Sequence, residues 1–146
     1  MSLFAKGGGF ITLIVCLDNN SGIMFNKRRQ SRDKNVIADI VKTAENRKIY
    51  VSKYSKSLFS ENSVVIFNNS TVFKMDYDDY VFIENLIPKN IINFTETLII
   101  YRWNTDYPYD IQFEIDFSKF KLISSSDFVG NSHKKITKEI YKNEKV

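Results

Sequence analysis

The sequence is poor in residues that form cross-links and metal sites: its 146 residues include one cysteine, Cys16, and one histidine, His133. A single cysteine cannot form a disulfide within the chain, and a structural zinc site needs more cysteine and histidine ligands. A Ser-His-Asp triad would have to use His133, and we do not expect one because this residue lies among lysines near the C-terminus. Cys16 lies within an apolar run, so we expect it to be a small core residue.

Long hydrophobic runs are also absent. The longest, residues 10–17, is far shorter than the roughly 20 apolar residues of a membrane-spanning helix. One lysine precedes this run and no small-residue cleavage site follows it, so we expect no signal peptide. We therefore expect a cytoplasmic protein with no membrane partner, in which residues 1–10 are a leader and residues 11–146 form a single domain.

The chain is moderately basic, with a formal net charge of +4 and a pI of about 9.1. Apolar residues make up 43% of the chain, which is enough for a hydrophobic core and argues against global disorder. The abundance of Ile, Asn and Lys is typical of AT-rich genomes, such as those of many phages. One basic cluster leaves open an anion- or nucleic-acid-binding module: Lys27, Arg28, Arg29, Arg32 and Lys34. A solvated charged loop explains it more simply, because few aromatic side chains suited to base stacking lie nearby.

Hydrophobic periodicity predicts strands that alternate with helices and then strands alone. Residues 11–17 form a continuous apolar run, typical of a strand buried on both faces, and residues 33–47 carry one apolar stripe at helical spacing. Further strands are expected at 49–51, 64–67, 80–83, 97–103 and 111–115, a short helix at 88–94, and a closing hairpin at 120–124 and 135–141. This order predicts an α/β domain whose central sheet of seven or eight strands is mostly parallel, with an antiparallel C-terminal hairpin.

Several short motifs occur in the order and at the spacing that dihydrofolate reductases show. Residues 14–23 combine an apolar strand, an Asp/Asn turn and a Gly-Ile pair. Residues 47–55 resemble the family's second strand and the turn after it, and residues 109–114 are similar to its Gly-Asp-Thr-x-Phe-Pro segment. The chain therefore resembles the dihydrofolate reductase family over residues 11–142. This resemblance implies an αβα sandwich, an NADPH cofactor and a dihydrofolate substrate.

The single active-site acid that the resemblance implies falls on Val36 when the sequences are read without a gap. The family's acid pairs with the pterin and assists protonation beside the hydride acceptor, and a valine has neither an acceptor nor a proton to give. A three-residue gap would place Asp39 there instead. Asp39 lies roughly 130° from the centre of the helix's apolar stripe, whereas Val36 lies within it, so the sequence favours Val36. We therefore expect no catalytic residue, unless the gapped register makes it Asp39.

The cofactor side of the resemblance is also altered. In the family, adjacent glycines after the fourth predicted strand let the backbone approach the cofactor's pyrophosphate, and here Glu84 and Asn85 take their place. A carboxylate at this position repels a diphosphate. Lys53, Tyr54 and Ser55 remain as positions that offer a cation and hydroxyl groups to a phosphate. We expect no cofactor, and NADPH only if the protein is an active reductase.

Two further departures complete the functional expectation. Residues 29–31, Arg-Gln-Ser, replace the Leu-Pro-Trp segment of the family, and Tyr101 replaces a threonine that helps to bind the pterin. We expect a pseudoenzyme that has lost reductase activity and acts as a binding or interaction protein of unidentified partner. The alternatives are a divergent NADPH-dependent dihydrofolate reductase and the anion- or nucleic-acid-binding module. The expected pocket lies between strand 11–17 and the predicted helix, lined by Val15, Cys16, Val36, Ile37, Ile40 and Tyr101.

Overall fold

The computed structural model describes residues 10–59, 64–68 and 79–144. Most of the expected leader, residues 1–9, lies outside this part of the chain. The elements, in chain order, are β1 (Ile11–Leu17), β2 (Gly22–Phe25), β3 (Arg28–Arg29), α1 (Lys34–Ala44), β4 (Ile49–Val51), the 3-10 helix η2 (Tyr54–Phe59), β5 (Val65–Ile66), β6 (Tyr80–Ile83), η4 (Ile91–Phe94), β7 (Thr95–Arg102), β8 (Ile111–Gln112), η5 (Phe117–Lys119), β9 (Phe120–Phe128) and β10 (Ile136–Asn143).

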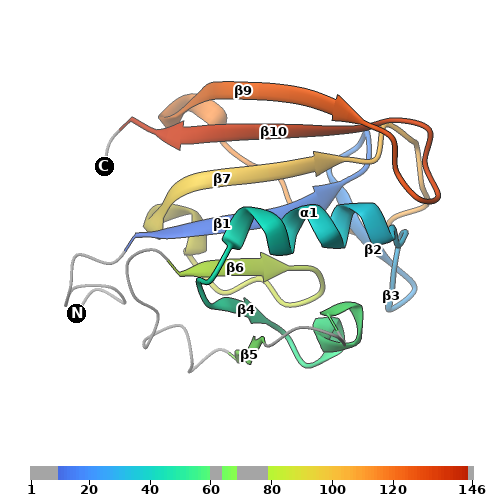
Figure 1. Ribbon diagram of the computed structural model, residues 1–146, viewed down its shortest axis with the longest axis horizontal. Helices are drawn as coiled ribbons and strands as arrows, with labels where there is room; N and C mark the ends of the chain where they lie inside the picture. The colour runs from blue at the N-terminus through green and yellow to red at the C-terminus, as the bar shows by residue number, and fades with distance from the viewer. Residues whose placement is uncertain (1–9, 60–63, 69–78, 145–146) are drawn as a thin grey trace.

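Seven of these strands form one sheet, in the order β5-β4-β6-β1-β7-β10-β9. β1 lies at its centre and pairs in parallel with β6 and β7, so that Leu13 lies between Val81 and Leu98. β10 runs antiparallel to β7 and pairs with β9, which forms the edge of the sheet (Figure 1). The expected mixed sheet, mostly parallel with an antiparallel C-terminal hairpin, is confirmed.

Both faces of the parallel part are covered, which explains why β1 is apolar along its whole length. α1 lies across one face (Figure 1) and buries Val36, Ile40 and Ala44 against it. The opposite face carries a second cluster of buried side chains, to which Val15 and Ile91 belong. No helix among the described residues is long and apolar enough to cross a membrane.

Two expected elements differ from the structure. The helix ends at Ala44 rather than near residue 47, because Glu45 has a positive φ of 54°, which is incompatible with a continuing α-helix. The strand expected at 111–115 is only β8, which pairs with β2 and lies in a separate sheet of order β3-β2-β8. Phe113 is buried, and its backbone N–H bonds to the carbonyl of Ser21 rather than continuing that pairing. Two residues of this small sheet, Ile23 and Arg29, line a cleft beside α1.

Candidate functional site

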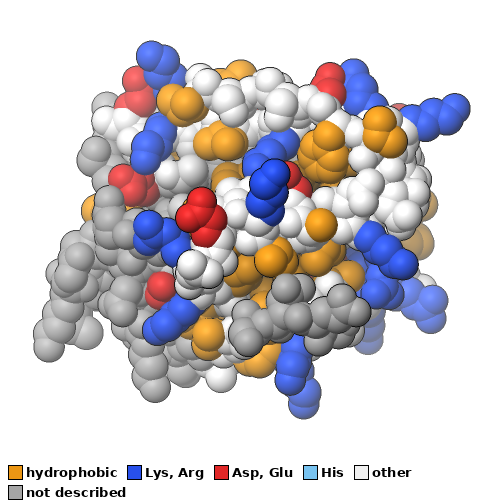
Figure 2. All heavy atoms as spheres, in the orientation of Figure 1, with side chains coloured by type: hydrophobic (Ala, Val, Ile, Leu, Met, Phe, Trp, Pro, Cys, Tyr) orange, Lys and Arg blue, Asp and Glu red, His pale blue; other side chains and the backbone are white. Residues whose placement is uncertain are grey.

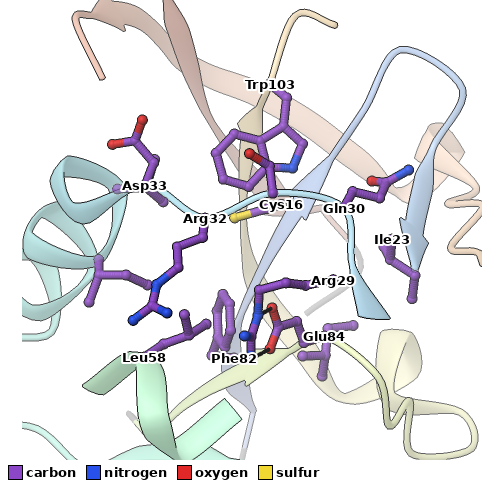
Figure 3. Close-up of a pocket in the computed structure, with 14 residues that line it drawn as sticks. Cys16, Ile23, Arg29, Gln30, Arg32, Asp33, Leu58, Phe82, Glu84 and Trp103 are labelled. Carbon is purple, nitrogen blue, oxygen red and sulfur yellow. Dashed lines mark hydrogen bonds and ion pairs between the residues drawn. The ribbon is translucent and has the colours of Figure 1, made fainter. Parts of the chain in front are cut away.

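A cleft lies at the carboxyl ends of β1 and β6, beside the first turn of α1 (Figure 3). The room inside it is small, because the centre of a water-sized sphere can occupy only about 20 Å³ of it. This is the edge of an open α/β sheet at which ligands commonly bind. Its lining combines apolar side chains with a few charged ones: Cys16, Ile23, Arg29, Gln30, Ser31, Arg32, Asp33, Val36, Ile37, Leu58, Phe82, Ile83, Glu84 and Trp103.

Three of the six residues expected to line the pocket, Cys16, Val36 and Ile37, do line this cleft. The other three do not, and each has a physical reason. Val15 alternates with Cys16 along β1 and therefore points to the opposite face of the sheet, where it is buried. Ile40 lies one helical turn beyond Val36 and is fully buried in the core. The hydroxyl of Tyr101 turns away to bond Asp39.

The two candidate acid positions on α1 have different surroundings. Val36 is 1% exposed and presents a hydrocarbon side chain to the cleft. Asp39 lies outside that lining, and its Oδ2 accepts a hydrogen bond of 2.6 Å from the Tyr101 hydroxyl and an ion pair of 2.8 Å from Lys138 Nζ. Burial, together with the adjacent Asp39 carboxylate, raises the pKa of Tyr101 well above its usual value. Asp39 thus joins α1 to β10 and β7, outside the cleft.

At one end of the cleft, the Glu84 carboxylate is held by groups from two other segments. The Arg29 guanidinium makes a two-pronged ion pair with it, at 2.7 Å from Nε to Oε2 and 3.2 Å from Nη2 to Oε1 (Figure 3). The Ser55 hydroxyl donates to Oε1 at 2.6 Å. Arg29 also lies over the ring of Tyr54, 4.5 Å from its centroid, and the Tyr54 hydroxyl accepts the Arg29 backbone N–H at 2.9 Å. The structure therefore brings Tyr54, Ser55 and Glu84 together, with Arg29 as a partner that sequence reasoning did not identify.

The remaining candidate cofactor positions have different environments. Asn85 is exposed, and its Oδ1 accepts a hydrogen bond of 2.7 Å from the buried Ser52 hydroxyl. Lys53 is exposed. Burial raises the pKa of the Cys16 thiol, and Glu84 and Asp33 raise it further, so Cys16 is a neutral part of the lining. No group of three or more His, Cys, Asp or Glu side chains in the described part of the chain has the arrangement of a metal site.

At the other end of the cleft, the Asp33 carboxylate connects the start of α1 to the loop between β9 and β10. Its side chain is fully buried, and it caps the helix by accepting the Asn35 backbone N–H at 2.9 Å. It also accepts the backbone N–H groups of Asn131 and Ser132, at 2.7 and 2.8 Å. His133 Nδ1 lies 2.9 Å from Asp33 Oδ2. Burial opposes ionisation, but these hydrogen bonds hold the pKa of Asp33 well below its usual range.

The other ring nitrogen of His133 faces two hydroxyl groups. Its Nε2 lies 3.1 Å from Ser31 Oγ and 2.8 Å from the Tyr107 hydroxyl. The imidazole is stacked on Trp103, with ring centroids 4.6 Å apart, and its side chain is 6% exposed. Ser31, His133 and Asp33 thus form a continuous serine–histidine–aspartate arrangement, although the sequence analysis did not expect one.

Sequence reasoning missed this arrangement because Asp33 and His133 are 100 residues apart and come together only when the β9–β10 loop docks on α1. One signal was present in the sequence. Asp33 precedes the predicted helix, where an aspartate side chain caps backbone N–H groups, and the chain has one histidine that could pair with it.

Most of the basic cluster lies at the surface. Lys27, Arg28, Arg32 and Lys34 are exposed, whereas Arg29 is directed into the cleft toward Glu84. Figure 2 shows Lys and Arg side chains projecting around the end of the molecule at which β3 lies. Four of the five members are therefore solvated, and only Arg29 and Arg32 belong to the cleft lining.

No family model matches the chain, and no curated protein matches it. Solved structures match its fold: the dihydrofolate reductase from Enterococcus faecalis complexed with NADP(H) and RAB-propyl superposes with a TM-score of 0.69, at 13% sequence identity. The match covers 94% of this chain and 97% of that chain. The chain has a dihydrofolate-reductase-like fold.

A reductase-like fold implies NADPH, and the residues at the carboxyl end of β6 do not fit its diphosphate. The residues after Ile83 are Glu84, Asn85 and Leu86, so there is no glycine whose missing side chain would let a phosphate come close to the backbone. The Glu84 carboxylate is negative, and Arg29 and Ser55 hold it in place. A diphosphate there would meet a like charge and would have to break a two-pronged ion pair.

Proposed function

We propose that this chain has lost dihydrofolate reductase activity and uses its cleft to bind a ligand or partner without reducing it. The observation that supports this most is the Arg29–Glu84 pair, whose Nε and Oε2 atoms are 2.7 Å apart. The pair takes the position where the resemblance implies a cofactor diphosphate, and its two side chains are only 18% and 10% exposed. Val36 adds a second argument, because a hydrocarbon beside the expected pterin site can neither anchor the pterin nor supply a proton.

The ligand that this cleft fits best is uncharged and apolar at its inner end. Val36, Ile37, Leu58, Phe82 and Trp103 supply hydrocarbon and aromatic surface, whereas Glu84 is already paired with Arg29. A cationic ring would find no free carboxylate among these lining groups, and an aromatic or aliphatic group would be well packed. The divergent-reductase alternative has less support, because its candidate acid Asp39 is bonded to Tyr101 and Lys138.

The direct test measures cofactor binding and turnover separately. We expect saturating NADPH neither to raise the melting temperature nor to quench the fluorescence of Trp103, which lines the cleft. A ligand at 100 times its Kd would stabilise the fold by about 2.7 kcal/mol, so binding would be visible. We also expect no NADPH oxidation with dihydrofolate, under conditions in which an active dihydrofolate reductase serves as the positive control. Saturable NADPH binding accompanied by turnover would overturn the proposal.

Two double variants test whether the Arg29–Glu84 pair is what prevents NADPH from binding. R29A/E84G removes both the carboxylate and its partner and shortens the side chain at the end of β6, so we expect NADPH to bind measurably better than to the native chain. R28A/E96G is the control, because Arg28 is exposed and Glu96 lies on β7 outside the cleft lining. Equal NADPH affinity in the two double variants would show that the Arg29–Glu84 pair is not what excludes the cofactor.

A further inference from the structure

We propose that Ser31, His133 and Asp33 form an acyl-transfer site that attacks esters whose acyl group enters the apolar cleft. The basis is the geometry: Ser31 Oγ is 3.1 Å from His133 Nε2, and His133 Nδ1 is 2.9 Å from Asp33 Oδ2. A nucleophile bonded to a base, with the base held by a buried carboxylate, is the arrangement by which serine hydrolases activate a hydroxyl group. This proposal shares only the cleft with the proposed function, and reductase assays do not test it.

The hydrogen bonds around Asp33 determine which proton each group carries. An ionised Asp33 only accepts hydrogen bonds, so neutral His133 must carry its proton on Nδ1, which faces Oδ2. Its Nε2 is then the unprotonated nitrogen, and it faces the Ser31 hydroxyl at 3.1 Å and the Tyr107 hydroxyl at 2.8 Å. The Tyr107 hydroxyl also donates to Ser31 Oγ at 3.3 Å. The backbone N–H groups of Asn131 and Ser132 fix the carboxylate, and stacking on Trp103 fixes the imidazole plane. The histidine is therefore held in the tautomer that can take a proton from serine.

The position of Ser31 determines which substrates can reach it. Ser31 lines the cleft together with Val36, Ile37 and Trp103, so a short acyl group that contacts these apolar side chains would lie beside Oγ. Arg32 follows Ser31 in the chain and also lines the cleft, and Figure 3 shows its side chain directed toward Leu58. The chemical class is thus an ester with an uncharged, apolar acyl group.

The reaction balances without a cofactor. Ser31 Oγ forms a bond to the ester carbonyl carbon while its proton passes to His133 Nε2. The tetrahedral intermediate collapses, the bond from carbon to the alcohol oxygen breaks, and the alcohol leaves with the proton from Nε2. A water molecule then attacks the acyl-serine and gives a proton to Nε2, and cleavage of the bond to Oγ releases the carboxylic acid as Ser31 regains its proton.

The test uses a fluorophosphonate probe on the full chain, with peptide mass spectrometry to locate the adduct. We expect phosphonylation at Ser31, and a burst of p-nitrophenolate from p-nitrophenyl butyrate that is larger than from the acetate. S31A should abolish both, whereas S125A should change neither, because Ser125 is exposed on β9, outside the cleft lining. Absence of a Ser31 adduct in folded native protein overturns the proposal.

Two further variants separate catalysis from a structural role. H133Q keeps an amide donor for Asp33 but removes the base, so we expect labelling of Ser31 to slow by about 100-fold or more. Labelling of folded H133Q at the native rate would overturn the proposal. Y107F removes the other hydroxyl that shares Nε2, so we expect labelling at least as fast as in the native chain. If labelling of Y107F falls to background while the variant remains folded, Ser31 depends on the Tyr107 hydroxyl for its reactivity rather than on His133, and the proposal is wrong.

Discussion

Two buried carboxylates lie at the two ends of one cleft, and their partners differ in kind. Glu84 is paired with a cation, since Arg29 approaches it with two nitrogens and Ser55 adds a hydroxyl. Asp33 is bonded mainly by backbone N–H groups and by the His133 ring. The carboxylate that pairs with arginine has its hydrogen-bonding capacity occupied by that ion pair. The carboxylate that bonds one nitrogen of a histidine leaves the other nitrogen, Nε2, free to accept a proton. A carboxylate thus disfavours an anionic ligand at the Glu84 end of the cleft, and it orients the His133 ring at the Asp33 end.

Removing the Asp33 carboxylate should have the largest effect on stability. D33A deletes a helix cap and leaves the N–H groups of Asn131 and Ser132 and the His133 ring without their acceptor. Caps contribute about 1 kcal/mol, and each buried donor left unpaired costs about 1–3 kcal/mol, so we expect a loss of roughly 3–5 kcal/mol. Urea unfolding followed by circular dichroism measures it.

D116A is the matched control for this variant. Asp116 also caps a helix, η5, by accepting the Ser118 N–H at 3.0 Å, but it does so at an exposed position. We expect its loss to be much smaller than that of D33A. Equal losses in the two variants would mean that the Asp33 network adds nothing beyond an ordinary cap.

The Arg29–Glu84 pair should be the next most sensitive feature. R29M keeps an apolar stem but leaves a nearly buried carboxylate without its cation, and we expect a loss of about 2–3 kcal/mol, less than for a fully buried pair. R29M/E84Q removes the uncompensated charge while the Gln side chain can still accept from Ser55, so it should recover part of the loss. A double variant no more stable than R29M would contradict a charge-based explanation.

The Asp33 end of the cleft should also be sensitive to acid. The pKa of Asp33 is lower in the folded chain than in the unfolded chain, where an aspartate titrates near 3.9. Its contribution is therefore fully present at neutral pH and is lost progressively as the pH falls below about 4. D33N should show a weaker decrease in stability over that range than the native chain, measured by urea unfolding at pH 7 and pH 3. Parallel pH profiles would contradict the role of Asp33.

We expect the smallest losses of stability when either of two tyrosine hydroxyl groups is removed. Y54F removes the acceptor of the Arg29 backbone N–H, a bond of 2.9 Å, and should cost about 1 kcal/mol. Y107F should cost less, since Ser31 remains to bond His133 Nε2. Thermal unfolding of both variants gives the comparison, and a larger loss for Y107F would reverse it.

The framework of the fold could be predicted from local patterns. The continuous apolar run of β1 predicts a strand that is buried on both faces of a parallel sheet. The helical stripe that includes Val36 predicts which face of α1 packs on that sheet. Both patterns lie within a short stretch of sequence. The end of the helix was misplaced because Glu45 has a positive φ, which nothing in its residue type indicates.

The site was harder to predict, because its polar contacts join distant segments. Arg29 and Glu84 are separated by 55 residues, and Ser31 and His133 by 102. Hydrophobic periodicity carries no information on such pairs, since side-chain hydrogen bonds depend on where loops dock. Val36 could be placed because it belongs to a stripe, whereas His133 could not because it lies in a loop between two strands.

The docking of the β9–β10 loop on α1 has a consequence for how the chain is made. During synthesis the residues of α1 leave the ribosome long before His133 does, and Asp33 then has only the nearby Asn35 N–H from its final set of partners. The start of the helix reaches its native hydrogen bonding only after the C-terminal hairpin has been translated and has packed. A nascent chain stalled before residue 131 should therefore hold this helix more loosely than the released protein does.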